Sequence, residues 1–294
     1  MLSRCYKLIG FKFRIHPLFT LIMALSAVTG RFLELVTLFG IVLIHESGHA
    51  AAAKHFGWRM REVLLTPFGG VASTDEDGSI PAREEAIVAL CGPLMNVLMI
   101  GFALVMEAAG IWTYVWSAYF IQANAILALF NLLPVMPLDG GRLVQVAISY
   151  AMPYYRTLHM TTYGSMLAGA CMLGMALSGT GTGGINLNAA IIGGFLIYSN
   201  WHAWRTIHFR FIRFLISRKS RVVRWRQTGK AAKPITAAPG TSVADVVHRL
   251  HRERLHLVLI VRGDGRLLAA LPEERCTEHY IEKGRNRAVS ELFR

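Results

Sequence analysis

Six apolar stretches restrict what this chain can fold into. Each is close to the roughly 20 residues that a membrane-spanning helix needs. Backbone polar groups must be hydrogen-bonded internally in a bilayer, so such segments fold as helices. The sequence therefore predicts a polytopic α-helical membrane protein with about six transmembrane helices. The stretches are residues 15–29, 32–56, 85–109, 113–136, 157–179 and 186–208.

The first stretch is the shortest and has a second interpretation. Its basic start, apolar middle and Ser26-Ala27-Val28 are also typical of a cleaved signal peptide. We favour a retained helix, because six spans account for the distribution of Lys and Arg. These residues gather in the N-terminal arm, the second and fourth connections and the region after the last span, which predicts that both termini are cytoplasmic.

A basic segment follows the last predicted span. Nine Lys or Arg residues lie between positions 205 and 230, with no acid among them. Nucleic acid is one partner that fits such a segment, but its place directly after a span is explained more simply by contact with anionic lipid. We therefore assign residues 211–229 to a basic juxtamembrane linker and expect no nucleic acid partner. The net charge of +13 then reflects membrane topology.

The second stretch contains the string HESGH, at residues 45–49. Residues four apart lie on one face of a helix, so His45 and His49 can bind one metal ion, with Glu46 beside them as a proton acceptor. Polar groups in lipid are costly unless they are paired, coordinated or hydrated, which favours a functional site. Taken alone, the short pattern is equally consistent with two partly solvated helical histidines.

A second acidic position follows the fourth stretch, in the string NLLPVMPLDGGR at residues 131–142. Pro134 and Pro137 interrupt a helix, and irregular backbone at membrane depth is tolerated where it lines a site. The predicted topology places both His45 and Asp139 towards the cytoplasmic side, so these residues can meet. Two histidines and one carboxylate leave one position open, which is the arrangement of a catalytic zinc.

The open position determines the predicted reaction. Zinc lowers the pKa of a bound water to about 7 and polarises a carbonyl group. Glu46 would take the proton from this water and pass it to the leaving amine. Asn131, eight residues before Asp139, is a candidate donor to the developing oxyanion.

The two motifs together resemble those of the site-2 intramembrane zinc metalloproteases, peptidase family M50, and in particular its sporulation branch. The resemblance extends to LTPFGGVA at residues 65–72 and GPLMN at residues 92–96. It implies His45, His49 and Asp139 as zinc ligands, Glu46 as catalytic base and Asn131 as a polar active-site residue.

The same resemblance implies regulated intramembrane proteolysis of a membrane-associated protein. For the sporulation branch the implied substrate is a pro-sigma factor, the implied location is the membrane around the forespore, and membrane inhibitory partners are implied as well. It also implies a membrane-associated β-hairpin over residues 62–72, where two short extended runs are broken by Pro67 and two glycines. An edge strand there would offer main-chain hydrogen bonds to an extended substrate.

Beyond about Lys230 the composition becomes that of a soluble α+β domain. The pattern predicts extended runs at 234–236, 257–261 and through Ala270, a helix near 242–254 and a helical end near 287–293. This order resembles one cystathionine-β-synthase (CBS) motif, a module that often binds adenine nucleotides, which implies ATP as a ligand. A dimerisation domain without ligand is equally consistent.

Three domains are therefore predicted: a six-helix metalloprotease domain over 1–210, the basic linker over 211–229 and the CBS-like domain over 230–294. A unit of about 60 residues is marginal alone, so we expect homo-oligomers that pair through the C-terminal domain. Two other functions remain open. One is an inactive homologue that binds a membrane partner, and the other is a metal transporter, although the repeated halves expected of a transporter are not found.

Overall fold

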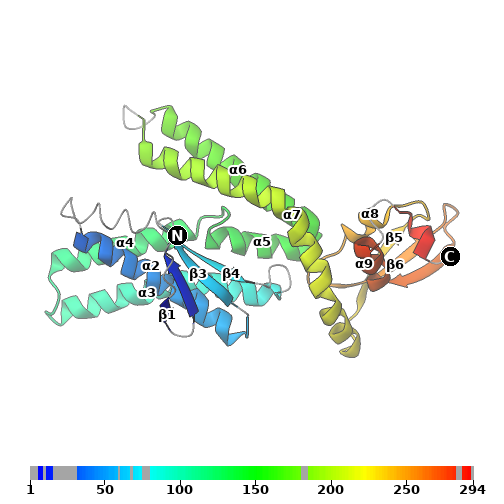
Figure 1. Ribbon diagram of the computed structural model, residues 1–294, viewed down its shortest axis with the longest axis horizontal. Coiled ribbons are helices and arrows are strands. Elements are labelled where there is room, and N and C mark those ends of the chain that lie inside the picture. The colour runs from blue at the N-terminus through cyan, green and yellow to red at the C-terminus, as the bar shows by residue number, and fades with distance from the viewer. Residues whose placement is uncertain are drawn as a thin grey trace. The chain divides into compact units, whose positions relative to one another are not determined.

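The computed structural model describes residues 6–8, 11–15, 32–58, 60–66, 69–74, 80–179, 185–282 and 287–292, and these are mostly helical (Figure 1). The first predicted span, 15–29, lies almost wholly outside the described residues. The chain divides into two compact units. Unit 1 comprises Met1–Glu76, Arg83–Pro134 and Leu138–Leu143, and unit 2 comprises Asp77–Ala82, Val135–Pro137 and Val144–Arg294.

Unit 1 is built on three long helices: α2 Phe32–His55, α3 Ala82–Ala108 and α4 Tyr114–Asn131. The start of α5, Asp139–Ala151, joins them. Apolar side chains such as Leu94, Val97 and Phe102 of α3 are exposed, whereas His45, Asn96 and Asn124 are buried. This distribution is the reverse of that in a soluble helical protein and suits helices that are surrounded by lipid and enclose a polar interior.

A four-stranded sheet accompanies these helices, in the order β1-β2-β3-β4. Its strands are β1 Tyr6–Leu8, β2 Phe11–Ile15, β3 Met60–Thr66 and β4 Gly69–Thr74. The hairpin predicted over 62–72 is confirmed, because β3 and β4 pair antiparallel up to Thr66 and Gly69. The strands β1 and β2 were not predicted, and β2 pairs parallel with β3. Among the strands described, β4 pairs with β3 alone and so forms an edge of the sheet.

In unit 2, the helices α6 Tyr154–Leu177 and α7 Leu187–Gln227 pack along each other (Figure 1). Residues 211–227 of the predicted linker lie on α7, which continues without a break for 41 residues. The sequence has no Gly or Pro from 195 to 227, so nothing in this segment favours ending the helix. The basic segment is therefore an extension of the last apolar helix.

Three of the described helices are long and apolar enough to cross a membrane, namely α2, α3 and α6. They correspond to the predicted spans 32–56, 85–109 and 157–179. The span predicted at 113–136 is represented by the 18-residue α4, and the one at 186–208 by the first half of α7. The chain is a membrane protein, and the count of six spans stays a prediction.

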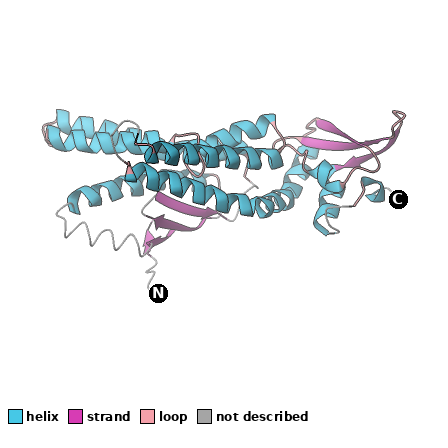
Figure 2. Ribbon diagram, turned by 90° about the horizontal axis from the view of Figure 1, so that it is seen from above, coloured by secondary structure: helices cyan, strands magenta, loops and turns pink. Residues whose placement is uncertain are grey.

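The C-terminal part of unit 2 is an α+β fold with sheet order β5-β6-β7 (Figure 2). Its elements are β5 Ala232–Ala237, α8 Val243–Val247, β6 Leu255–Val261, β7 Leu267–Pro272, α9 Glu273–Glu282 and the 3₁₀ helix η1 Val289–Leu292. Buried side chains from α6, α7 and these elements form one core: Leu158, Ile207, Phe211, Phe214, Val243, Val246, Val258 and Ile260. The end of α7 thus belongs to the core of this fold.

The helix predicted near 242–254 is shorter than expected. The α8 helix begins at a Ser242 cap, whose hydroxyl accepts from the Asp245 N–H, and ends at Val247. The following carbonyl groups of His251, Arg252 and Arg254 accept hydrogen bonds from the guanidinium of Arg218 on α7. A side chain of another helix therefore satisfies carbonyl groups that lie beyond the end of α8.

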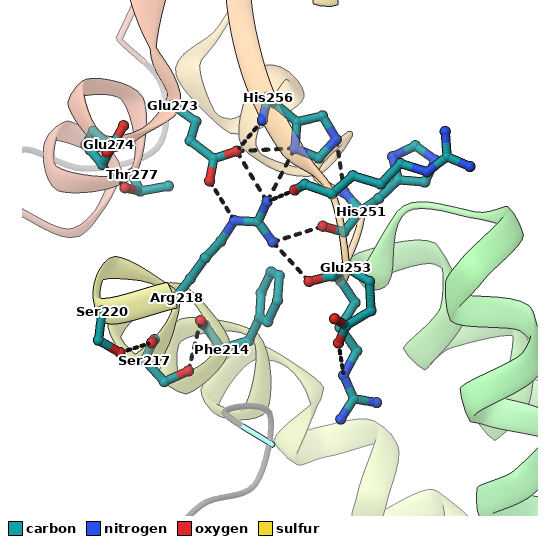
Figure 3. A network of polar contacts seen from close by, with 12 residues as sticks. Phe214, Ser217, Arg218, Ser220, His251, Glu253, His256, Glu273, Glu274 and Thr277 are labelled. Carbon is teal, nitrogen blue, oxygen red and sulfur yellow. Dashed lines mark hydrogen bonds and ion pairs between the residues drawn. The ribbon is translucent and has the colours of Figure 1, made fainter. Parts of the chain in front are cut away.

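Arg218 is the centre of a buried network (Figure 3). Both Arg218 and Glu273 have side chains that are 1% exposed, and Arg218 Nε donates to Glu273 Oε1 at 2.7 Å. The backbone N–H of His256 donates to Glu273 Oε2 at 2.9 Å, and the ring Nδ1 of His256 lies 3.0 Å from the same oxygen. Burial by itself raises the pKa of Glu273, but His256 and the charge of Arg218 outweigh it and hold this pKa below the usual 4.5.

Candidate metal centre

Helix α2 and the start of α5, both in unit 1, bring the three predicted ligands together. His45 and His49 lie one turn apart on α2, and their Nε2 atoms are 3.2 Å apart. Asp139 is the first residue of α5, and its Oδ2 atom lies 3.3 Å from His45 Nε2 and 3.2 Å from His49 Nε2. The prediction that these side chains meet is confirmed, although they are separated by 90 residues in the sequence.

The donor set and its spacing fit zinc. Two imidazole nitrogens and one carboxylate oxygen are the ligand types of catalytic zinc sites. In a tetrahedral site with bonds of about 2.0–2.1 Å, ligand atoms lie about 3.3–3.4 Å apart. The three separations of 3.2, 3.3 and 3.2 Å nearly match this value. His45, His49 and Asp139 could therefore hold one metal ion and leave one position for another ligand.

Two glycines allow α2 and α3 to approach closely at this point. A Cβ atom on Gly92 of α3 would overlap the His49 ring and lie 2.7 Å from His45 Nε2. A Cβ atom on Gly48 of α2 would lie 2.6 Å from the carbonyl oxygen of Cys91. Any larger residue at position 92 would occupy the space in front of the imidazoles, so the metal face of the histidines depends on this glycine.

The backbone between α4 and α5 is irregular, as the two prolines predicted. Gly140 packs directly against the Leu132 and Leu133 carbonyl oxygens, where a Cβ atom would overlap them. The N–H of Met136 donates to Ser165 Oγ at 2.8 Å, and its carbonyl accepts from Asn200 Nδ2 at 2.6 Å. These bonds satisfy backbone groups that a helix would otherwise pair, and Asp139 follows three residues later.

The two remaining predicted residues lie on the same elements. Glu46 is half-buried and directly follows His45 in α2, and Asn131 is the half-buried last residue of α4. Their catalytic roles stay predictions. Asn131 lies seven residues after Asn124 and so shares a face of α4 with it.

Two polar side chains that the structure places near the histidines were not predicted as part of the site. Asn96 of α3 contacts the ring of His45, and Asn124 of α4 contacts Asn96. Asn96 ends the GPLMN string that carried part of the family resemblance, but nothing in the sequence indicated which side chain it would meet. A buried amide in an apolar helix was the signal that could have drawn attention to both.

Comparisons with known proteins agree with this site. The sequence matches the model of peptidase family M50 over residues 33–108 and 99–173. It is 31% identical over 287 residues to stage IV sporulation protein FB of Bacillus subtilis strain 168, with 96% of each chain covered. It is also 31% identical over 165 residues to zinc metalloprotease MJ0392 of Methanocaldococcus jannaschii, which covers 52% of this chain and 48% of that protein.

A solved structure shares the fold. The site-2 protease from Methanocaldococcus jannaschii superimposes with a TM-score of 0.52 at 23% identity, over 67% of this chain and 93% of that one. His45, His49 and Asp139 all lie within the residues that match the family model.

Proposed function

Because the chain belongs to peptidase family M50, the site-2 protease family, and is thus a zinc-dependent protease, we propose that it cleaves a membrane-associated protein within or near the bilayer. One observation carries this proposal. The ligand atoms of His45, His49 and Asp139 lie within 4.8 Å of one another, and both histidines lie on a helix that is long and apolar enough to cross a membrane.

His45, His49 and Asp139 would hold the zinc ion through two ring nitrogens and a carboxylate oxygen. When bound, zinc acts as a Lewis acid that lowers the pKa of a water molecule to about 7 and polarises the scissile carbonyl. Asp139 also contributes a negative charge that offsets the charge of the ion in an apolar setting.

Glu46 is the proposed general base. It accepts a proton from the attacking water and delivers this proton to the amide nitrogen as the peptide bond breaks, so one water and one peptide bond give a carboxylic acid, which then ionises, and an amine. Asn131 is the proposed donor to the substrate carbonyl oxygen as negative charge develops there. The β4 edge strand would pair with an extended substrate segment through main-chain hydrogen bonds.

The proposed substrate is a pro-sigma factor, processed in the membrane around the forespore, with both termini of this chain in the cytoplasm. The support is the similarity to stage IV sporulation protein FB over 96% of each chain. The proposal further includes membrane proteins that inhibit the protease until its substrate is required.

Co-expression tests this substrate. We expect a candidate pro-sigma factor from the same organism to be shortened when it is produced with the wild-type chain and to stay full-length with Glu46→Gln. Immunoblotting of the two cultures is the measurement. A pro-sigma factor that stays full-length with the wild-type chain would exclude it as the substrate, and equal shortening in both cultures would contradict the role of Glu46.

For the C-terminal domain we propose a CBS-like module that pairs with a second copy of the chain and binds ATP. Its sheet exposes Leu257, Leu267 and Leu268, which a partner would cover. We expect saturable binding when the purified full-length protein is titrated with ATP to millimolar concentration. No binding over that range would indicate a dimerisation domain without a nucleotide ligand.

A further inference from the structure

A chain of buried side-chain amides runs from the main chain of α4 to the ring of His45. His45 Nδ1 lies 2.5 Å from Asn96 Oδ1. Asn96 Nδ2 donates to Asn124 Oδ1 at 3.0 Å, and Asn124 Nδ2 donates to the Phe120 carbonyl at 2.9 Å. Asn96 and Asn124 are both 0% exposed and His45 is 2% exposed, so solvent is excluded from these three side chains.

The Phe120 carbonyl, at one end of this series of hydrogen bonds, fixes which group donates and which accepts in every bond of the series. The Phe120 carbonyl can only accept, so the NH₂ group of Asn124 must face it. The oxygen of Asn124 then faces Asn96, so Asn96 must donate to it from its own NH₂ group. Asn96 is left with its oxygen towards His45, so the ring proton of His45 is on Nδ1 and the lone pair is on Nε2.

His49 is held in the same tautomer by a single hydrogen bond to the main chain. His49 Nδ1 lies 2.8 Å from the main-chain carbonyl of Val88 on α3, which also can only accept. Both rings therefore direct an unprotonated Nε2 towards Asp139 Oδ2. His49 needs only one backbone group, whereas His45 depends on two side chains that substitution can change.

We propose that Asn96 and Asn124 are positioning residues of the metal centre, which hold His45 in the tautomer and ring orientation that binds zinc. The proposal rests on the function proposed above. Outer hydrogen bonds of this kind orient a metal-binding imidazole and raise its basicity, and their loss typically lowers metal affinity about 10- to 100-fold.

Two variants of Asn96 that keep the side chain branched at Cγ separate this role from packing. Asn96→Leu removes the acceptor at His45 Nδ1, whereas Asn96→Asp keeps an oxygen there. The measurement is zinc affinity of the purified full-length protein in detergent, by competition with a chromophoric chelator. We expect Asn96→Leu to bind zinc about 10- to 100-fold more weakly than the wild type, and Asn96→Asp to bind it more tightly than Asn96→Leu.

A double variant tests whether Asn124 acts through Asn96. We expect Asn124→Leu to weaken zinc binding less than Asn96→Leu does. In Asn124→Leu the oxygen of Asn96 can still accept from His45, but the hydrogen bond that holds the Asn96 amide in place is lost. The double variant should then bind no more weakly than Asn96→Leu alone, since coupled residues are not additive. Ser117→Ala is the matched control, because Ser117 is equally buried on the same face of α4, seven residues before Asn124.

The visible absorption of the Co²⁺-substituted protein gives a second readout that does not depend on proteolysis. Its spectrum should change in Asn96→Leu and stay close to the wild type in Ser117→Ala. Unchanged zinc affinity in Asn96→Leu, equal affinities of Asn96→Leu and Asn96→Asp, or additive losses in the double variant would each overturn the proposal. Zinc affinity of Asp139→Ala, the variant without the carboxylate ligand, tests the function proposed above separately. If that function is wrong, the wild type will bind zinc no better than this variant.

Discussion

Replacement of Glu46 by Gln is expected to abolish proteolysis without removing the metal. Glutamine keeps the size and hydrogen-bonding shape of the side chain but cannot accept a proton, and general acid–base catalysis typically contributes about 10²- to 10⁴-fold to the rate. Glu46 is not among the three residues whose ligand atoms converge, so zinc content should stay at one ion per chain, equal to that of the wild type. Substrate cleavage and metal analysis of the same purified sample provide both measurements.

A second carboxylate on the same helix is the control for this result. Glu34 lies in the first turn of α2, 12 residues before Glu46 and about 18 Å along the helix axis. Glu34→Gln removes the same charge from the same helix and should leave cleavage unchanged. Wild-type rates in Glu46→Gln would contradict the proposed mechanism, and loss of zinc in that variant would instead place Glu46 among the ligands.

Arg218→Met is expected to destabilise the C-terminal part of unit 2 by about 3–5 kcal/mol, which is typical when one partner of a buried ion pair is removed. The substitution leaves the carboxylate of Glu273 without its guanidinium partner and orphans the turn carbonyls that accept from Arg218 (Figure 3). The measurement is protease resistance of the C-terminal region across a urea series, in the purified full-length protein.

The neighbouring residue provides the control for burial. Lys219 forms an ion pair with Glu278 at 2.8 Å, close to the 2.7 Å of Arg218 and Glu273, but its side chain is 70% exposed against 1% for Arg218. Exposed pairs contribute about 0–1 kcal/mol, so Lys219→Met should shift the urea midpoint little. Equal shifts in the two variants would show that the buried network contributes no more than a surface pair.

The stabilising effect of Glu273 should also depend on pH. Its folded pKa lies below the usual 4.5, so the stability it contributes is fully present above that pH and is lost as the pH falls through the folded value. The difference in urea midpoint between the wild type and Glu273→Gln is therefore expected to narrow as the pH falls below 4.5. A difference that widens as the pH falls below 4.5 would contradict this sign.

The sequence predicted those elements whose pattern is local. Long apolar runs predicted α2, α3 and α6, and two extended runs broken at Pro67 and the following glycines, together with the family resemblance, predicted the β3–β4 hairpin. Elements that depend on partners elsewhere were missed or misjudged. The short β2 strand forms by pairing with β3. The α8 helix ends at Val247, and the carbonyls of the turn that follows it bind Arg218. The α9 helix was also missed, although Pro272 and two glutamates mark its start.

The candidate site divides in the same way. The spacing of His45 and His49 places both rings on one face of α2, whatever surrounds the helix. The paired prolines end α4 before Asp139. The sequence by itself therefore determined the ligand types. Only the tertiary structure decided which way the rings are turned. That orientation comes from Val88, Asn96 and Asn124, on two other helices, and a hydrogen bond between distant segments leaves no periodic trace in either of them.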